Sequence, residues 1–291
     1  MNLSTSPAVT VTTLADAHRA IRVCWQHRAL MRDGGDVEAG RRARVTHGIV
    51  GLREDPVAVE GVEPIGQLGE PGLELARARN MAGDWAAERE PDLMIFLDAD
   101  CLPGRDLVEG YLRAARQHPD SVLSGPVSYL PPAETQSLEG GEVSAAELVA
   151  TVRTNPHPAR PAPAPGQTRL ASAEEYDVFW SLSFAVTPFT WRRIREEFGG
   201  FDEQLRGYGG EDTDFGWQLC AHGIPLVWVG DAQAFHVWHP VSSPPVEHVE
   251  DIVTNANQCH EKWGRWPMLG WLREFEELGK VRFQDGKWRV M

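Results

Sequence analysis

One apolar run followed by acidic residues constrains the fold more than any other feature. The run Leu93–Leu97 (LMIFL) is continuous and ends in Asp98-Ala-Asp100, with Pro103-Gly104 beyond. A short apolar run bounded by turn residues is typical of a central strand covered on both faces. The pattern predicts an α/β protein with a mostly parallel sheet flanked by helices. Ligands of such sheets bind outside the carboxyl ends of the strands, which is where Asp98 and Asp100 stand.

The two aspartates of this D-x-D motif suggest a metal. Two carboxylates placed together repel each other and are costly to desolvate without a cation. A divalent ion that shares its ligands with phosphate oxygens removes that cost. The alternative is a solvated turn with aspartates at its tip, and the motif alone does not decide between the two.

A second candidate site is the segment GYGGEDTDF at 207–215. Its glycines allow positive φ and close approach to a ligand. Glu211 and Asp212 fall near the first turn of a helix predicted at 213–222. The amino end of a helix favours ionised carboxylates, which can accept a proton. The plainer interpretation is an acidic helix cap after a turn.

Two histidines form the third feature, in AFHVWHP at 234–240. A strand predicted at 225–229 precedes them. Strand alternation would place His236 and His239 on opposite faces unless a bend intervenes. We therefore expect only one of them to reach a metal. One packed and one exposed histidine is the alternative.

Taken in order, these motifs resemble those of glycosyltransferases with the GT-A fold, of the family 2 type. The second half resembles β-1,4-galactosyltransferases and polypeptide N-acetylgalactosaminyltransferases. Further matches are the aromatic-rich segment 179–194 and GGFDE at 199–203, while Tyr208 stands where the family usually has Trp. The resemblance covers 75–240 well and 8–75 loosely. It implies one large Rossmann-like domain with a mixed, mostly parallel sheet flanked by helices. Its parts would be a donor half (1–128), a Pro/Gly-rich connection (129–172) and an acceptor half with C-terminal helices (173–291).

The resemblance also implies roles for individual residues. The donor would be a nucleotide sugar, with UDP-hexose favoured, held with Mn²⁺ or, less well, Mg²⁺. Asp212 would be the general base of an inverting transfer to an acceptor hydroxyl, with Glu211 fixing the acceptor. The implied metal ligands are Asp100 with His236 or His239, of which His236 is preferred. The implied donor-binding residues are Asp98, Arg77, Arg79, Asn80, Thr12, Thr13 and Asp55. The residues implied to line the acceptor and the sugar, here called the sugar wall, are Trp180, Ser181, Tyr208, Gly209 and Gly210.

Helical geometry limits which of the implied donor-binding residues can face the same ligand. Arg77 and Arg79 are two apart and cannot face one ligand from a regular helix, whereas Asn80 shares a face with Arg77. Two other functions stay open: a retaining transferase of the same fold, and a non-catalytic protein that binds nucleotide sugars or carbohydrate.

Composition narrows the choice of partners. The formal net charge of −14 argues against binding to nucleic acid or anionic lipid. No apolar stretch approaches the ~20 residues of a membrane helix, and no secretory signal is visible. Four widely spaced cysteines without a C-x-x-C pair suggest reduced thiols. These features predict a cytoplasmic location.

The rest of the chain gives a coarse map. Strands are expected at 9–13, 45–52, 62–68 and 121–129, and helices at 15–32, 106–117 and 263–279. A loop is expected at 33–44 and an extended segment at 130–170, whose Pro-rich part is most simply a tolerated surface insertion. Glycines flanking Tyr208 suggest that 206–210 moves when donor binds.

Overall fold

The computed structural model describes residues 6–32, 42–69 and 73–291. Within these residues the main sheet has eight strands in the order β3-β2-β1-β4-β9-β6-β10-β8. The strands are β1 (Ala8–Ala15), β2 (Arg44–Gly51), β3 (Glu63–Gln67), β4 (Leu93–Leu97), β6 (Val122–Ser124), β8 (Thr168–Leu170), β9 (Ser183–Val186) and β10 (Leu226–Val229). Four neighbouring pairs are parallel, while β9 runs antiparallel to β4 and β6, and β8 antiparallel to β10. This is the predicted mixed, mostly parallel sheet.

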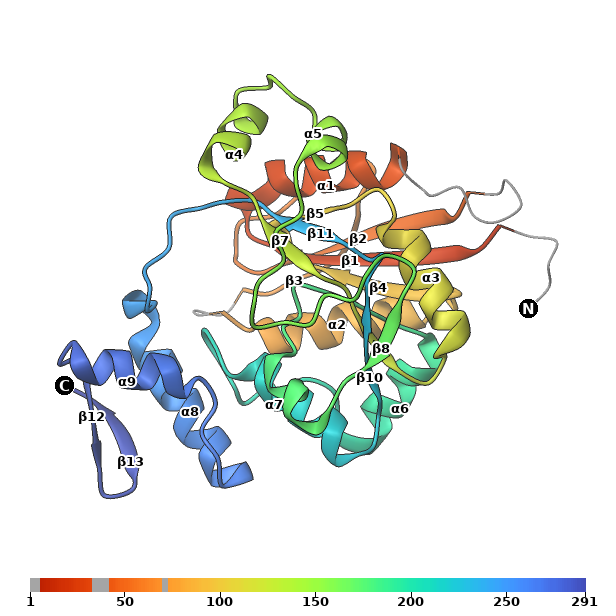
Figure 1. Ribbon diagram of the computed structural model, residues 1–291. Helices are drawn as coiled ribbons and strands as arrows, with labels where there is room; N and C mark the ends of the chain where they lie inside the picture. Colours follow the sequence, from red (N-terminus) through yellow and green to blue (C-terminus); the bar gives the residue numbers. More distant parts are fainter. Residues whose placement is uncertain (1–5, 33–41, 70–72) are drawn as a thin grey trace.

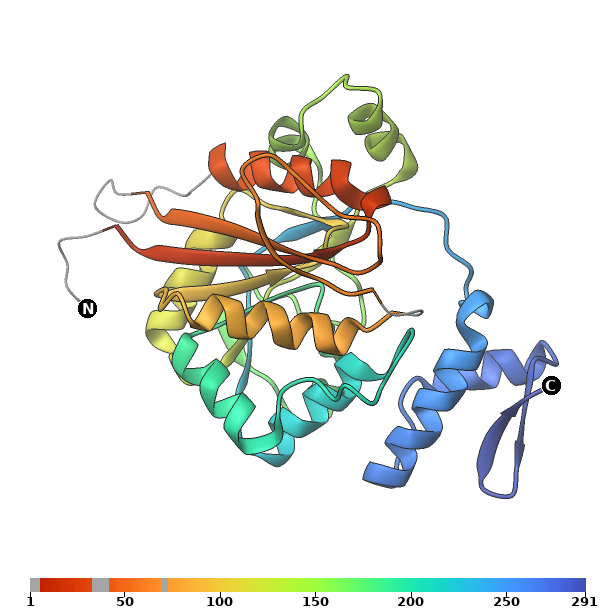
Figure 2. The same cartoon turned by 180° about the vertical axis from the view of Figure 1, so that it is seen from behind.

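Helices cover both faces of the sheet, as Figures 1 and 2 show. They are α1 (Ala20–Arg32), α2 (Leu75–Ala87), α3 (Leu107–Gln117), α6 (Pro188–Phe198) and α7 (Glu211–Ala221). The short 3₁₀ helix η1 (Ala17–Arg19) directly precedes α1, and a second one, η2 (Ala173–Val178), contacts α7. Alternate residues of β4 enter different cores. Met94 and Phe96 pack with α2, α6 and α7, while Leu93, Ile95 and Leu97 pack with α3. The apolar run is therefore a central strand because it must satisfy two apolar layers at once.

A small second sheet crosses the carboxyl edge of the first. It consists of β5 (Cys101–Pro103), β11 (Ala234–His236) and β7 (Val127–Tyr129), with β11 in the middle. The register places His236 opposite Cys101 and opposite Tyr129. Segments far apart in sequence thus meet directly after the D-x-D motif.

The connection at 130–170 differs from the extended segment that was expected. It contains α4 (Pro132–Glu139), α5 (Ala145–Thr151) and strand β8. Pro132 occupies the first turn of α4, where a proline is tolerated. Ser144 and Glu147 form a reciprocal capping box on α5. The proline-rich part, 155–166, has no helix or strand apart from an isolated bridge at Pro156. Most of the loop expected at 33–44 lies outside the described residues.

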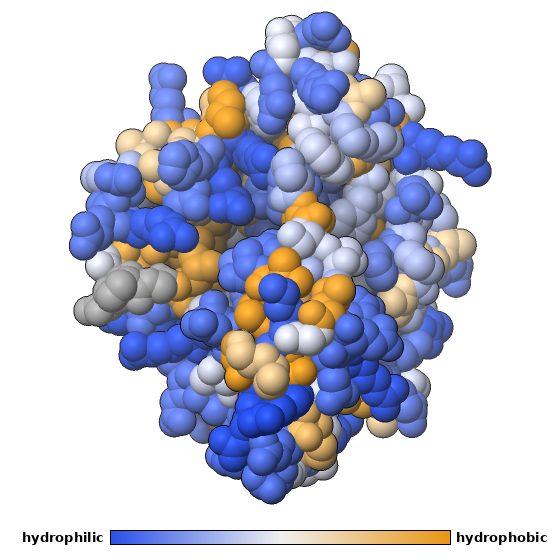
Figure 3. Space-filling view, turned by 90° about the vertical axis from the view of Figure 1, so that its left-hand side faces the viewer, coloured by the Kyte–Doolittle hydropathy of each residue, from blue (hydrophilic) through white to orange (hydrophobic). Residues whose placement is uncertain are grey.

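The C-terminal residues form a separate unit beside the main body (Figure 1). After η3 (Val246–His248) it comprises α8 (Val249–Trp263), α9 (Leu269–Glu277) and the hairpin β12 (Val281–Gln284) and β13 (Lys287–Val290), around its own apolar cluster. The helix expected at 263–279 is thus wrong at its start. Gly264, with φ 70°, ends α8, and Pro267 follows in the turn before α9. Figure 3 looks onto this side and shows scattered apolar surface among hydrophilic residues.

None of the helices in the described residues is long and apolar enough to cross a membrane.

Candidate functional site

Strand pairing places the D-x-D motif beside the segment that precedes β9. Leu97, the last residue of β4, lies opposite Ser183, the first residue of β9. The next backbone amide, of Asp98, donates a hydrogen bond to the Leu182 carbonyl over 3.0 Å. Trp180 and Ser181 consequently stand next to the acidic end of the central strand.

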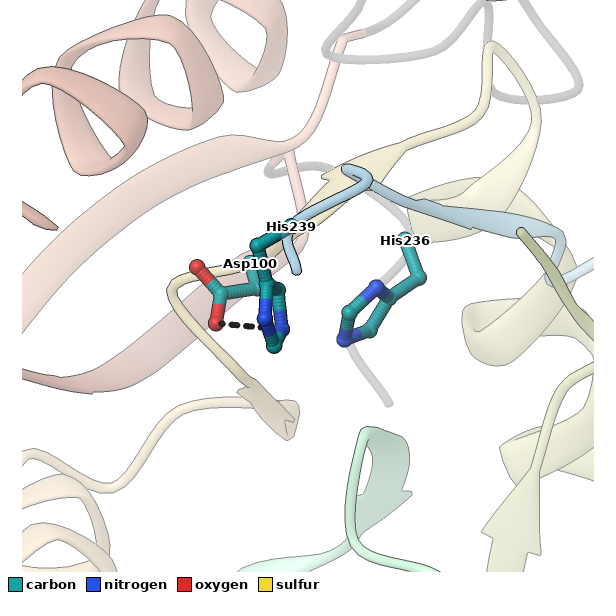
Figure 4. A group of neighbouring side chains, drawn as sticks. All are labelled: Asp100, His236 and His239. Atoms are coloured by element: carbon teal, nitrogen blue, oxygen red, sulfur yellow. Dashed lines mark ion pairs between the residues drawn. The ribbon is translucent and has the colours of Figure 1, made fainter. Parts of the chain in front are cut away.

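The small sheet gathers Asp100, His236 and His239. The Val237 amide donates to the Asp100 carbonyl over 2.7 Å, which continues the pairing of β11 with β5. One ligand atom from each of the three side chains lies within 4.8 Å of those of the other two. Figure 4 shows the three side chains grouped together, with Nε2 of His239 3.7 Å from Oδ2 of Asp100.

Both histidines therefore belong to this group, although strand alternation led us to expect only one. The reason is local: β11 ends at His236, and the chain bends before His239. Strand alternation applies only within a strand, so the second ring is free to turn back toward the first. The ring centroids lie 5.4 Å apart.

The protonation of this group suits a cation. Burial lowers the pKa of His236 to about 4, so the ring is neutral near pH 7 and its lone pair is available. Its buried Nδ1 has no hydrogen-bond partner among the described residues. Although burial alone would raise the pKa of Asp100, Arg19 and Arg22 hold it below its usual value. Two imidazoles and an ionised carboxylate could together hold a divalent metal ion.

Glu211 and Asp212 open α7, two residues earlier than the sequence predicted for the helix. Gly210 precedes them with φ 96°, a conformation that a side chain would disfavour. The Ser181 amide donates to Oδ2 of Asp212 over 2.9 Å. The other oxygen, Oδ1, is buried and accepts no hydrogen bond within the described residues. Oδ1 of Asp212 is thus fixed in direction, with no hydrogen bond from the described part of the chain and with Nη1 of Arg79 3.6 Å away.

Arg79 connects the D-x-D motif to these acidic residues. It is 5% exposed. Its guanidinium nitrogens lie 3.8 Å from Asp98, 3.2 Å from Glu211 and 3.6 Å from Asp212. Burial raises the pKa of Asp98 to about 6, with Arg79 opposing the shift. Burial, followed by repulsion from Asp212, also raises the pKa of Glu211.

The other two α2 residues assigned to the donor face elsewhere. Arg77 and Asn80 do share a face, but it borders a shallow hollow of about 390 Å³ with Trp85 and Arg195. Arg77 pairs with Glu74. Asn80 donates to the Phe201 carbonyl over 2.9 Å and accepts from the Phe201 amide, so it anchors the turn before α7. Of the three, only Arg79 reaches the acidic cluster, because it lies two residues from Arg77 on the helix.

The residues assigned to the nucleobase also need correction. The strand expected at 9–13 continues to Ala15, so Thr12 and Thr13 lie inside β1 and are at most 3% exposed. Their hydroxyls donate to the Ile95 and Leu97 carbonyls. A strand of β-branched residues carried no signal for its exact end. Asp55 is exposed on the loop after β2 and stays a candidate.

The two aromatic residues of the predicted sugar wall, Trp180 and Tyr208, have different neighbours. Trp180 contacts the His157 ring edge-on, with centroids 4.9 Å apart. Tyr208 stacks on His248 at 4.4 Å, and its amide donates to Asp251 of α8. Gly209 also bonds to α8, through its carbonyl and Asn255. The segment at 206–210 is thus docked on the C-terminal unit.

Sequence reasoning missed three arginines. Arg19, the last residue of η1, and Arg22, in the first turn of α1, pair with Asp100. Arg160, from the proline-rich part of the connection, is 6% exposed. No motif marks any of them, but each is a cation that the strongly acidic chain places close to the D-x-D end of the sheet.

Curated proteins similar in sequence to parts of this chain include a glucosyltransferase and a hyaluronan synthase. Validoxylamine A glucosyltransferase of Streptomyces hygroscopicus subsp. jinggangensis is 44% identical over 48 residues, 16% of this chain and 10% of that protein. Hyaluronan synthase of Pasteurella multocida is 26% identical over 179 residues, 57% of this chain and 18% of that protein. The chain spans less than a fifth of the length of these relatives.

Solved structures share the fold at low sequence identity. The crystal structure of S. aureus TarS 1–349 matches with a TM-score of 0.54 and 12% identity, over 87% of this chain and 65% of that one. GalNAc-T7 with UDP, GalNAc and Mn²⁺ matches with a TM-score of 0.54 and 12% identity, over 94% of this chain and 54% of that one. Both likenesses support the GT-A fold predicted from the motifs.

The family model described as "Glycosyltransferase like family 2" matches residues 70–227, more than half of the chain. That span contains Arg79, the D-x-D motif and the Glu211-Asp212 pair, and the chain therefore belongs to the family 2-like glycosyltransferases.

Proposed function

We propose that this protein transfers a sugar from a nucleotide-sugar donor to an acceptor hydroxyl, with inversion at the anomeric carbon. The observation that carries the proposal is the state of Asp212. Its Oδ2 is held by the Ser181 amide, and its buried Oδ1 accepts no hydrogen bond from the described residues. A carboxylate fixed in this way beside a strand end is prepared to take a proton.

Asp212 would act as the general base. Its Oδ1 takes the proton of the acceptor hydroxyl as that oxygen forms a bond to the anomeric carbon. The bond from this carbon to the diphosphate breaks on the opposite side, and the nucleoside diphosphate leaves with the electron pair. Glu211 hydrogen-bonds the acceptor, and Arg79 holds Asp98, Glu211 and Asp212 in place.

A divalent cation would be held by Asp100, His236 and His239. When bound, it supplies positive charge next to the departing diphosphate. Asp98 lies on the donor side and binds its ribose or sugar, while Trp180 and Tyr208 offer apolar faces for pyranose rings. We favour Mn²⁺ over Mg²⁺ because two of the three ligands are imidazoles.

A UDP-hexose is the favoured donor, and a small molecule or a glycan is the acceptor. A cytoplasmic location stays a prediction, for which the support is four cysteines that are all free.

The experiment is a thermal-shift panel of UDP-, GDP- and dTDP-sugars with Mn²⁺ or EDTA. We expect one nucleotide series to raise the melting temperature clearly more with Mn²⁺. Linkage gives about 2.7 kcal/mol when the ligand is at one hundred times Kd. Transfer with that donor, followed by NMR of the product, gives the anomeric configuration. Equal stabilisation in EDTA would remove the metal from the proposal, and a retained configuration would remove Asp212 as an inverting base.

A further inference from the structure

The proline-rich part of the connection, residues 155–166, is built into the site rather than lying loose on the surface. The Asn155 amide donates to Ser128 Oγ over 2.8 Å, and the His157 amide donates to the Val127 carbonyl over 3.2 Å. Pro156 forms a bridge with Ser128. The segment therefore follows β7 along the edge where the D-x-D motif lies.

This segment carries a buried cation without a counter-charge. Nη2 of Arg160 donates to Ser124 Oγ over 2.6 Å and to the Gly125 carbonyl over 3.4 Å, but Nε and Nη1 have no hydrogen-bond partner among the residues that the structure describes. Within the described ranges Arg160 forms no ion pair, and burial lowers its pKa. A buried, unpaired charge with unmet donors destabilises a fold. Its presence therefore points to a ligand that completes it.

The surroundings place this ligand next to the proposed base. The guanidinium carbon is 5.6 Å from the Trp180 ring centroid and 5.5 Å from that of Trp228. Trp180 directly precedes Ser181, whose amide holds Asp212. Within the described part of the chain, five buried polar atoms of this neighbourhood have no hydrogen-bond partner: Arg160 Nε and Nη1, Ser181 Oγ, Asp212 Oδ1 and His236 Nδ1.

The charge of the neighbourhood limits what the ligand can be. Arg160 contributes one positive charge, and no carboxylate of the described residues lies within ion-pair distance of its guanidinium. A single carboxylate balances this guanidinium one for one, whereas a dianion such as a phosphate monoester would add a second negative charge, which the carboxylate of Asp212 would repel. A carboxylate is also a common monoanion on a sugar ring.

We propose that Arg160 is a specificity-determining residue that binds a carboxylate on a sugar substrate, carried by either the donor sugar or the acceptor. The inference rests on the proposed function, since it assumes that sugars occupy the space beside Asp212. A charge-assisted hydrogen bond from a desolvated guanidinium discriminates by roughly tenfold or more between a carboxylate and a neutral hydroxymethyl group.

The test uses Arg160→Met, which keeps an apolar stem between the two tryptophans, and Arg153→Met, an exposed arginine earlier in the same connection, as control. Titrations with Mn²⁺ compare UDP, UDP-glucose and UDP-glucuronate, which tests the donor. A second series, with UDP and Mn²⁺ present, compares a glucuronate-terminated disaccharide with its glucose counterpart, which tests the acceptor. We expect a carboxylate preference in one series, its loss in Arg160→Met and its retention in Arg153→Met.

The melting temperature of each ligand-free variant provides an independent measurement. If the charge is unpaired in the free protein, Arg160→Met melts at the same temperature as wild type or higher. Marked destabilisation relative to Arg153→Met would make Arg160 a structural anchor and overturn the proposal. So would equal binding of neutral and carboxylate probes, or an equal loss of affinity for all three UDP ligands, which would assign Arg160 to the diphosphate.

Failure of UDP to bind wild type with Mn²⁺ counts against a uridine donor and not against Arg160. In that case, sodium glucuronate and glucose are compared directly by thermal shift. Absence of an Arg160-dependent preference for glucuronate there would also overturn the inference.

Discussion

Two acidic clusters lie at the same edge of the sheet, and their counter-charges differ. In the first cluster, Asp98, Glu211 and Asp212 share Arg79, whose side chain is 6% exposed. In the second, Asp100 pairs with Arg19 and Arg22, whose side chains are 38% and 16% exposed. Arg79 comes from α2 and is buried, while Arg19 comes from the end of η1 and Arg22 from the first turn of α1, and both are more exposed.

The difference separates a fixed cation from displaceable ones. Arg79 cannot leave without exposing three carboxylates to one another, so the first cluster is set for one arrangement. Arg19 and Arg22 can swing toward solvent and leave Asp100 to a metal ion with His236 and His239. We infer that the first cluster positions the base. In the second cluster, we infer that a bound metal ion replaces Arg19 and Arg22 as the partner of Asp100.

The largest expected effect is on turnover. Asp212→Asn keeps the shape and the hydrogen bond from Ser181 but removes the proton acceptor. It should lower the rate by on the order of 10²–10⁴-fold with donor affinity nearly unchanged. Steady-state kinetics and donor titration measure both quantities, with exposed Asp120→Asn as control. Glu211→Gln should weaken acceptor binding as well. Near-normal transfer by Asp212→Asn would refute its role as base.

The free energy of unfolding should distinguish the buried Arg79 from its half-exposed neighbour Arg77. Arg79→Met leaves three neighbouring carboxylates without their cation and should cost about 3–5 kcal/mol of unfolding free energy. Arg77→Met, two residues earlier on the same helix, removes only a half-exposed pair with Glu74 and should cost no more than ~1 kcal/mol. Urea denaturation measures both. Similar losses for the two variants would break the comparison on which the first cluster rests.

Metal affinity tests the displaceable arginines. Asp100→Ala should abolish stabilisation by Mn²⁺. Arg22→Gln removes a competing cation and should instead tighten the binding of Mn²⁺ alone by roughly two- to fivefold, in line with the ~0.5–1 kcal/mol of a partly exposed pair. Isothermal titration without nucleotide gives both values. Weaker Mn²⁺ binding in Arg22→Gln would show that the arginine supports the site.

The smallest expected effect concerns motion. The segment at 206–210 is bonded to Asp251 and Asn255 of α8, yet its glycines permit rearrangement. Amide exchange in peptides spanning 204–215 should slow when donor and Mn²⁺ bind, while peptides covering β4 should not change. Unchanged exchange at 204–215 would mean that Tyr208 is a static wall fixed by the C-terminal unit.

Local patterns were sufficient for the elements that carry strong periodicity. The run LMIFL predicted β4 because five consecutive apolar residues need cover on both faces. The helix after Gly210 followed from glycine and acidic residues at its start. The end of β1 was missed because a threonine-rich strand has no terminal signal. No helix was predicted at 249–263, and the helix expected at 263–279 began too early, because the turn at 264–268 depends on packing inside the C-terminal unit. The helices at 132–151 were missed because their neighbouring prolines dominated the pattern.

The sequence by itself determined the fold class and the segments that supply Asp98, Asp100, Glu211, Asp212 and the two histidines, since short motifs carry local chemistry. Only the tertiary structure decided which side chains meet. It selected Arg79 rather than Arg77 or Asn80, brought both histidines to Asp100, turned Thr12 and Thr13 inward and buried Arg160. Each of these outcomes depends on strand register or on packing between segments distant in sequence, and neither is encoded in any single stretch of the chain.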